Sequence, residues 1–269
     1  MRRIIIISVS ILIFALLVVY FVHIIPETIT SKGPGQQYIV SLGDSVAAGY
    51  GIDSSTSNNS CGQSESAYPI LLGKKLNKQV IQLACSGATV AAGKNSLLSQ
   101  YLTAKPYINN SDVVIYAGAN DIGWLQTIIS CTQTNCDTNQ NRNIISTKIV
   151  NLQSNLTSLL NKIQKDKPHR LIVNTYYQLL SNDNNCFSNV GITDQEINFI
   201  NAEEVFLNDS ITSAATNSKA TTVNVSFSGH LLCDKQSWIQ NVKDNAPLHP
   251  NLEGQEQISN QDYLVLSKP

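Results

Sequence analysis

The sequence predicts an α/β domain, a three-layer α/β/α sandwich in which helices cover both faces of a central, mostly parallel five-stranded sheet. One observation is that five short apolar runs alternate along the chain with segments of helical periodicity, as in parallel sheets with crossover helices. Another is that the apolar residues within these runs are mostly continuous, which is typical of strands covered on both faces. The chain has 269 residues, and the domain predicted at 38–269 is long enough to bury a full core.

The elements follow one another in a readable order. Between the third and fourth runs, apolar residues recur at helical spacing from Ile145 to Ile163 and predict a long amphipathic helix. Thr193 and Glu196 have the spacing of a capping box and predict the start of a further helix, whose apolar stripe Glu204 interrupts. The predicted strands are 38–42, 80–84, 112–118, 170–175 and 221–225, and the predicted surface loops are 53–66 and 131–143.

The N-terminal region differs in kind from the rest of the chain. Two arginines precede residues 4–22, which are nearly all apolar and would span about 28 Å as a helix, close to the hydrocarbon thickness of a bilayer. Residues 1–26 are therefore predicted to be a transmembrane signal anchor or, alternatively, a cleaved signal peptide, with the arginines on the cytoplasmic side. Residues 27–37 contain Gly and Pro and predict a linker, so the domain is expected outside the cytoplasm, tethered or secreted.

Charge and cysteine content exclude some partners. The net charge is −1 and there is no basic stripe, so we expect no nucleic-acid partner. All cysteines lie beyond the apolar segment and are even in number, which indicates disulfides in an oxidising compartment. Six cysteines allow 15 pairings, and the absence of any CxxC pair speaks against a metal site. The six are Cys61, Cys85, Cys131, Cys136, Cys186 and Cys233.

Polar and small residues follow the predicted strands, where open α/β sheets form their sites. The first strand runs into Asp44 and Ser45, the second into Gly87, and the third into Gly-Ala-Asn120-Asp121, while His249 precedes a last amphipathic segment. Together they offer a nucleophilic hydroxyl, backbone and amide donors, and an imidazole, which is the inventory for acyl transfer. Ser45 alone would more often be a helix cap, and the two aspartates are expected to bind loop backbone.

In these four blocks the chain resembles the SGNH (GDSL) hydrolase family, and most closely its secreted, disulfide-bonded esterase and lipase branch. The resemblance implies a flavodoxin-like fold without metal or cofactor, with Ser45 as nucleophile and His249 as general base. The backbone N–H groups of Ser45 and Gly87 and the Asn120 amide would form the oxyanion hole. It also implies the disulfides Cys61–Cys85, Cys131–Cys136 and Cys186–Cys233.

The family pattern fails at one position. Many members have an aspartate three residues before the histidine, where this chain has Ala246. A main-chain carbonyl can replace that acid in the disulfide-bonded branch, so we expect the Ala246 carbonyl to orient His249 in a Ser–His dyad. Asp244, five residues before the histidine, is the alternative third member.

The sequence therefore predicts a monomeric extracytoplasmic serine esterase or lipase that hydrolyses carboxylic esters through an acyl-enzyme on Ser45. The substrate stays open among small esters, lipid esters and acylated glycans. The alternatives are an acyltransferase that uses the same residues and a catalytically silent surface-binding domain.

Overall fold

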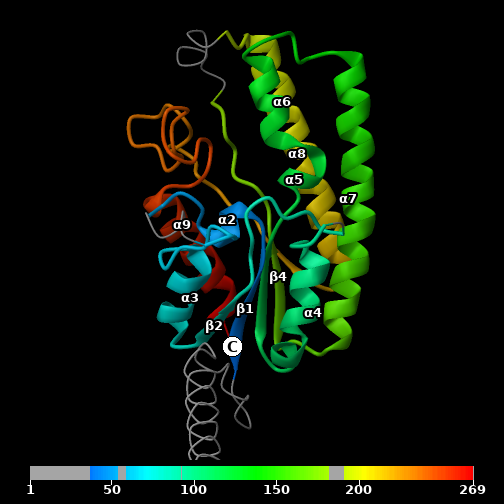
Figure 1. Ribbon diagram of the computed structural model, residues 1–269, viewed down its shortest axis with the longest axis vertical. Helices are drawn as coiled ribbons and strands as arrows, with labels where there is room; N and C mark the ends of the chain where they lie inside the picture. Colours follow the sequence, from blue (N-terminus) through cyan, green and yellow to red (C-terminus); the bar gives the residue numbers. More distant parts are fainter. Residues whose placement is uncertain (1–36, 54–58, 92, 182–190, 269) are drawn as a thin grey trace, which may run out of the picture. The chain divides into compact units, whose positions relative to one another are not determined.

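A five-stranded, all-parallel sheet forms the centre of the protein, with the order β2-β1-β3-β4-β5 (Figure 1). The computed structural model describes residues 37–53, 59–91, 93–181 and 191–268. This strand order is that of flavodoxin-like folds, whose site lies between β1 and β3. The predicted architecture is confirmed, and the sheet is parallel throughout. The strands are β1 Tyr38–Gly43, β2 Gln79–Gln82, β3 Asp112–Tyr116, β4 Arg170–Asn174 and β5 Thr221–Val223.

Helices cover both faces of the sheet (Figure 1). Helices α3 and α9 pack together on one face, and α7 packs against α8 and α4 on the other. The short helices α2, α5 and α6 lie near the carboxyl ends of the strands. The helices are α2 Ser45–Ala48, α3 Tyr68–Leu76, α4 Leu97–Ile108, α5 Ala119–Ile122, α6 Trp124–Cys131, α7 Asn139–Lys165, α8 Asp194–Asn217 and α9 Leu252–Leu266.

The two long helices agree with their sequence signals. The apolar stripe of α7 is buried from Ile145 to Ile163. Thr193 and Glu196 form the predicted capping box at the start of α8. Glu204 is buried inside the stripe of α8, and its carboxylate accepts the Leu179 N–H at 3.1 Å. Burial raises the pKa of Glu204 to about 8, so the side chain is buried as the uncharged acid at neutral pH, with a backbone donor on one of its oxygens.

The predicted loop at 131–143 is too long. Helix α7 already begins at Asn139, where the Thr138 side chain accepts the Asn141 N–H as a cap. The polar first turn of α7 faces solvent, so its composition resembles that of a loop. The segment between α6 and α7 therefore extends only from 132 to 138.

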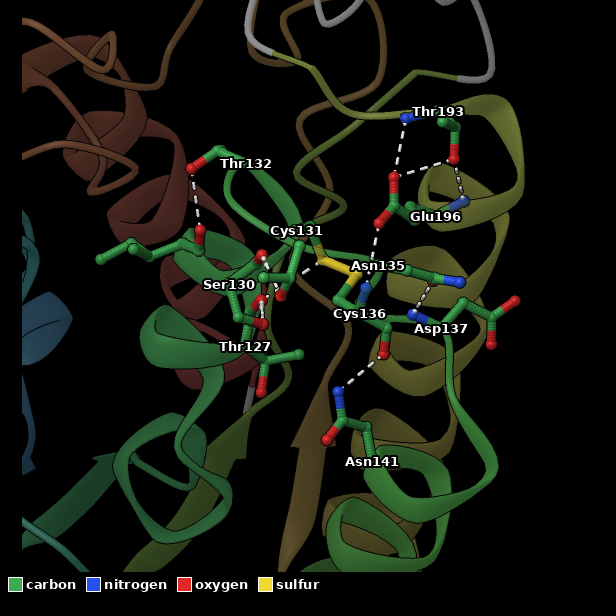
Figure 2. Close-up of a disulfide and its surroundings, with 12 residues drawn as sticks. Thr127, Ser130, Cys131, Thr132, Asn135, Cys136, Asp137, Asn141, Thr193 and Glu196 are labelled. Carbon is green, nitrogen blue, oxygen red and sulfur yellow. Dashed lines mark hydrogen bonds between the residues drawn. A yellow bond between two sulfur atoms is a disulfide. The ribbon is translucent and has the colours of Figure 1, made fainter.

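Two of the predicted disulfides are present, Cys61–Cys85 and Cys131–Cys136. Cys233 is also disulfide-bonded, and its predicted partner, Cys186, lies outside the described residues. The second bridge closes the end of α6 (Figure 2), where the Cys136 N–H donates to Glu196 of the α8 capping box at 3.0 Å. The end of α6 is thereby fastened to the start of α8.

The predicted anchor at 1–26 lies outside the described residues. Within the described part of the chain, none of the helices is both long and apolar enough to cross a bilayer. The anchor, and the linker predicted at 27–37, stay predictions.

Candidate active site

Ser45 stands at the first position of α2, immediately beyond the end of β1. A Cβ atom on Gly43 would lie 2.4 Å from the Tyr116 carbonyl oxygen and 2.6 Å from the Ala47 Cβ, so only glycine fits where β1 turns. Asp44 is the helix cap and accepts the Val46 N–H at 2.9 Å. The Ser45 hydroxyl is therefore not needed as a cap and is left for another partner.

That partner is His249. The Nε2 atom of His249 lies 2.8 Å from the Ser45 Oγ, and Nδ1 lies 3.0 Å from the Pro247 carbonyl oxygen. A carbonyl can only accept a hydrogen bond, so Nδ1 carries the proton and Nε2 is free to accept one from Ser45. This is the tautomer that a general base requires.

The carbonyl that hydrogen-bonds Nδ1 belongs to Pro247, one residue beyond the expected Ala246. The Ala246 carbonyl accepts the backbone N–H of His249 at 3.2 Å. The difference arises because Leu248 is in the left-handed region, with a φ of 67°, which turns the chain just before the histidine. Asp244 is exposed and its carboxylate accepts the Asn241 N–H at 2.7 Å, so it does not serve as a third member.

The surroundings of His249 keep its ring neutral. Burial lowers the pKa of His249 below its usual value, because a charged imidazolium loses hydration there. The carbonyls of Pro247 and Ala246 oppose this shift in part, since both favour the protonated ring. The result is a base that is unprotonated at neutral pH and is ready to accept a proton.

Gly87 lines the same cavity as Ser45. Its φ of 79° lies in the region that favours glycine, although a Cβ atom there would meet nothing within 4 Å. The amides on either side are occupied, since Ser86 N–H donates to the Cys61 carbonyl at 2.9 Å and Ala88 N–H to the Cys85 carbonyl at 3.0 Å. No described residue accepts the Gly87 N–H. The Cys61–Cys85 bridge therefore fixes the backbone around one free donor.

The side chain of Asn120 supplies a further donor. Its Nδ2 atom donates to the Ala88 carbonyl at 3.0 Å, which uses one of its two hydrogens and leaves the other for a ligand. The neighbouring Asp121 carboxylate accepts the Val90 N–H at 3.0 and 3.1 Å. The loops after β2 and β3 are thus bound to each other, as expected for Asp121.

These groups line one cavity of about 270 Å³. Ser45, Gly87, Asn120 and His249 all line it, and its other walls are mostly apolar and aromatic. A second, largely apolar cavity of about 730 Å³ adjoins it and shares Leu125, Ile128 and Leu248 as well as His249. The site residues predicted from the sequence are therefore brought together at one end of an extended apolar groove.

Two tyrosines of the site were not predicted. Tyr176 and Tyr177 follow β4 and line the same cavity, and the Tyr176 hydroxyl donates to the Asp44 carboxylate. Burial raises the pKa of Asp44 to about 7, against the hydrogen bonds from Tyr176 and Val46 that lower it. The sequence signal that could have identified the two tyrosines is their position directly after a predicted parallel strand, where open α/β sheets form their sites.

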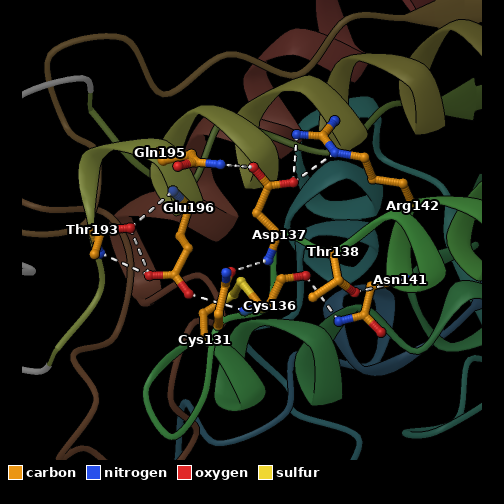
Figure 3. Close-up of polar contacts among 10 residues, drawn as sticks. Cys131, Cys136, Asp137, Thr138, Asn141, Arg142, Thr193, Gln195 and Glu196 are labelled. Carbon is orange, nitrogen blue, oxygen red and sulfur yellow. Dashed lines mark hydrogen bonds and ion pairs between the residues drawn. A yellow bond between two sulfur atoms is a disulfide. The ribbon is translucent and has the colours of Figure 1, made fainter.

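Among the described residues, one group of side chains has the spacing of metal ligands, but it does not form a metal site. That group is Cys131, Cys136 and Glu196, but the two cysteines are joined in a disulfide, which takes both sulfurs out of the thiolate form that metals bind. Figure 3 shows Glu196 occupied by Thr193 and by the Cys136 N–H, next to the ion pair of Asp137 and Arg142. The cluster is a structural one.

Comparison with known proteins gives one family match. The profile of the GDSL-like lipase/acylhydrolase family matches residues 41–257, whereas a search of curated sequences found no match. The chain is similar to the crystal structure of phospholipase A1 from Streptomyces albidoflavus, with 24% identity, 87% of this chain and 100% of that chain covered, and a TM-score of 0.73.

Two further solved structures share the fold. An extracellular lipase from Streptomyces rimosus has 23% identity and a TM-score of 0.66, with 86% of this chain and 100% of that chain covered. A catalytic mutant of an acetylxylan esterase from Geobacillus stearothermophilus has 13% identity and a TM-score of 0.56, with 89% and 98% covered. At these identities the likeness shows the fold alone.

Proposed function

The chain belongs to the GDSL-like lipase/acylhydrolase family and is a carboxylic ester hydrolase, and we propose that it cleaves its ester through an acyl-enzyme on Ser45. The observation that supports this most is the hydrogen bond from the Ser45 Oγ to His249 Nε2 at 2.8 Å, made by a ring whose Nδ1 faces a carbonyl. This pair lies in the same cavity as the free donors of Gly87 and Asn120.

In the first half-reaction, the Ser45 Oγ attacks the ester carbonyl carbon while His249 Nε2 takes its proton. The negative charge that develops on the carbonyl oxygen would be stabilised by the N–H groups of Ser45 and Gly87 and by the Asn120 amide. The Ser45 N–H qualifies because an N–H in the first turn of a helix has no acceptor within the helix. When the tetrahedral intermediate collapses, the ester C–O bond breaks and the leaving alcohol takes the proton from His249.

In the second half-reaction, water attacks the acyl-enzyme carbonyl while His249 again takes a proton. Collapse releases the carboxylic acid and returns the proton to Ser45. The imidazolium forms twice in the cycle and must be stabilised each time. The Pro247 carbonyl would do this through Nδ1–H, so that the site works as a Ser–His dyad without a carboxylate.

The apolar groove favours an ester with a medium or long acyl chain. Its outer part is lined by partly exposed apolar side chains, of which Leu125 is 39%, Ile129 46% and Val242 52% exposed. Such surface is costly in water unless a ligand covers it. A lipid ester would cover it, whereas an acetylated glycan would leave it wet.

We also propose that the enzyme works outside the cytoplasm as a monomer, tethered by residues 1–26 or released if these are cleaved. The disulfides Cys61–Cys85 and Cys131–Cys136 support an oxidising compartment. The Ser45–His249 hydrogen bond speaks against a silent binding domain, since such a domain would not need it.

The test is hydrolysis of p-nitrophenyl esters, from acetate to palmitate, by the full-length protein and its Ser45→Ala variant. We expect activity that Ser45→Ala abolishes and that rises from acetate toward chains of intermediate or greater length. A folded wild-type protein that leaves every ester intact would contradict the proposal. If added alcohol is acylated faster than water attacks, the acyltransferase replaces the hydrolase.

A further inference from the structure

Two consecutive tyrosines after β4 contact both halves of the catalytic apparatus. The chain here still runs beside β5, since the Thr175 N–H donates to the Val223 carbonyl at 3.0 Å. Tyr176 and Tyr177 follow, and each is only 6% exposed. Each hydroxyl reaches a different loop of the active site.

Tyr176 joins the nucleophile turn to the helix of the Asn120 donor. Its hydroxyl donates to the Asp44 carboxylate and accepts the Ala119 N–H at 2.9 Å. Asp44 caps the helix that begins with Ser45, and Ala119 directly precedes Asn120. Because one phenol can donate once and accept as well, this single hydroxyl fixes the spacing between the nucleophile and an oxyanion donor.

Tyr177 holds the histidine loop. Its hydroxyl donates to the Leu248 carbonyl at 2.7 Å, and its ring stacks on Phe227 with the centroids 4.4 Å apart. Leu248 has a φ of 67° and its N–H donates to the Gln240 carbonyl at 3.0 Å. A non-glycine residue in this region persists only where its surroundings enforce it. Tyr177 and Gln240 do so from two sides, one residue before His249.

The backbone of this segment is itself clamped by α8. Asn208 accepts the Tyr176 N–H at 2.8 Å and donates to the Tyr176 carbonyl at 2.9 Å. Both backbone groups of Tyr176 are thereby satisfied by a side chain outside the cavity. The two phenols are held on a fixed support and not on a free loop.

We propose that Tyr176 and Tyr177 are positioning residues, which set the distance of Ser45 from the Asn120 donor and from His249 respectively. This rests on the proposed serine mechanism and adds residues to it. Catalysis depends steeply on such distances, because a misplacement of about 1 Å can cost about 100-fold in rate. Neither tyrosine needs to touch the reacting atoms.

The test compares Tyr176→Phe and Tyr177→Phe with the matched control Tyr101→Phe. Tyr101 is 5% exposed and its hydroxyl donates to the Asp166 carboxylate at 2.7 Å. Neither residue lines the two cavities, so Tyr101→Phe removes a partly buried tyrosine–carboxylate bond without touching the site. Phenylalanine keeps the ring and the cavity wall. We expect kcat to fall about 10- to 100-fold in each site variant with KM within about threefold. In Tyr101→Phe we expect kcat to stay within about twofold, because the bond that it loses lies away from the site.

Asn208→Ala provides a second route that leaves both tyrosines in place. We expect it to lower kcat by about threefold to tenfold with KM unchanged, because Tyr176 loses its clamp. Thermal unfolding of all variants separates these losses from instability. If the site variants behave like Tyr101→Phe, or lose activity through KM alone, the proposal is wrong.

Failure of the proposed function is seen separately, as absence of Ser45-dependent hydrolysis in the wild-type protein. In that case the rate at which a fluorophosphonate labels Ser45 replaces kcat as the readout. Slower labelling in both site variants than in Tyr101→Phe would support positioning, and equal labelling would overturn it.

Discussion

Replacement of Asn120 by alanine should affect the catalytic rate much more than the stability of the fold. In the free protein one Asn120 amide hydrogen is engaged by the Ala88 carbonyl at 3.0 Å, so the variant loses one structural bond and one donor to the oxyanion. The structural bond is a neutral one on an exposed side chain and is worth about 1 kcal/mol of folding free energy. The donor acts mainly in the transition state, where loss of one such group costs about 2.7–4 kcal/mol, or about 10²- to 10³-fold in kcat.

The assay is steady-state hydrolysis of a p-nitrophenyl ester, with urea unfolding of the same preparations. We expect kcat to fall by that factor while KM changes little and the free energy of unfolding drops by about 1 kcal/mol. Asn120→Asp should be worse, since a carboxylate would repel the developing oxyanion. If Asn120→Ala raises KM and leaves kcat intact, Asn120 binds substrate and the oxyanion assignment is refuted.

Three further substitutions concern the orientation of His249, the backbone at Gly87 and the buried carboxyl of Asp262 on α9. Asp244→Asn should leave kcat within a few-fold, because the Pro247 carbonyl orients His249; a thousandfold loss in the same ester assay would contradict this. Gly87→Ala should destabilise the protein by about 1–2 kcal/mol and lower kcat, since its φ is 79°; urea unfolding that matches wild type would argue against it. Asp262, whose pKa burial raises to about 8, stays protonated when folded, so the free energy of unfolding should fall as pH rises from about 4 to 8. Asp262→Asn should make that slope shallower, while Asp44 and Glu204, whose pKa values burial also raises, keep part of it; an unchanged slope in unfolding curves at several pH values would exclude Asp262 as a contributor.

The fold and the main site residues could be predicted because their signals are local. Each strand is a short apolar run, and α7 carries its period over many turns. Ser45, Gly87, Asn120 and His249 sit in short blocks that keep their order along the chain. Parallel strands bring the first three blocks to one edge of the sheet, whereas His249 lies in the loop before α9 and its place beside them was predicted only from the resemblance.

The details that escaped prediction depend on backbone path and on long-range packing. The left-handed conformation of Leu248 decides which carbonyl, that of Ala246 or that of Pro247, faces Nδ1. A leucine in the sequence does not indicate this conformation. The roles of Tyr176 and Tyr177 depend on Asp44 and Leu248, which lie 132 and 71 residues away along the chain. A tyrosine whose hydroxyl positions an active-site loop and a tyrosine that only packs in the core look the same in the sequence. Only the folded structure distinguishes them.

An activated Ser45 nucleophile should react covalently with a fluorophosphonate. The full-length protein would be treated with a fluorophosphonate, digested, and examined by mass spectrometry beside Ser45→Ala and His249→Ala. We expect one adduct per chain on the peptide that contains Ser45, absent in Ser45→Ala and formed far more slowly in His249→Ala. If the folded protein gains no adduct, or gains it equally fast without His249, Ser45 is not a nucleophile activated by His249.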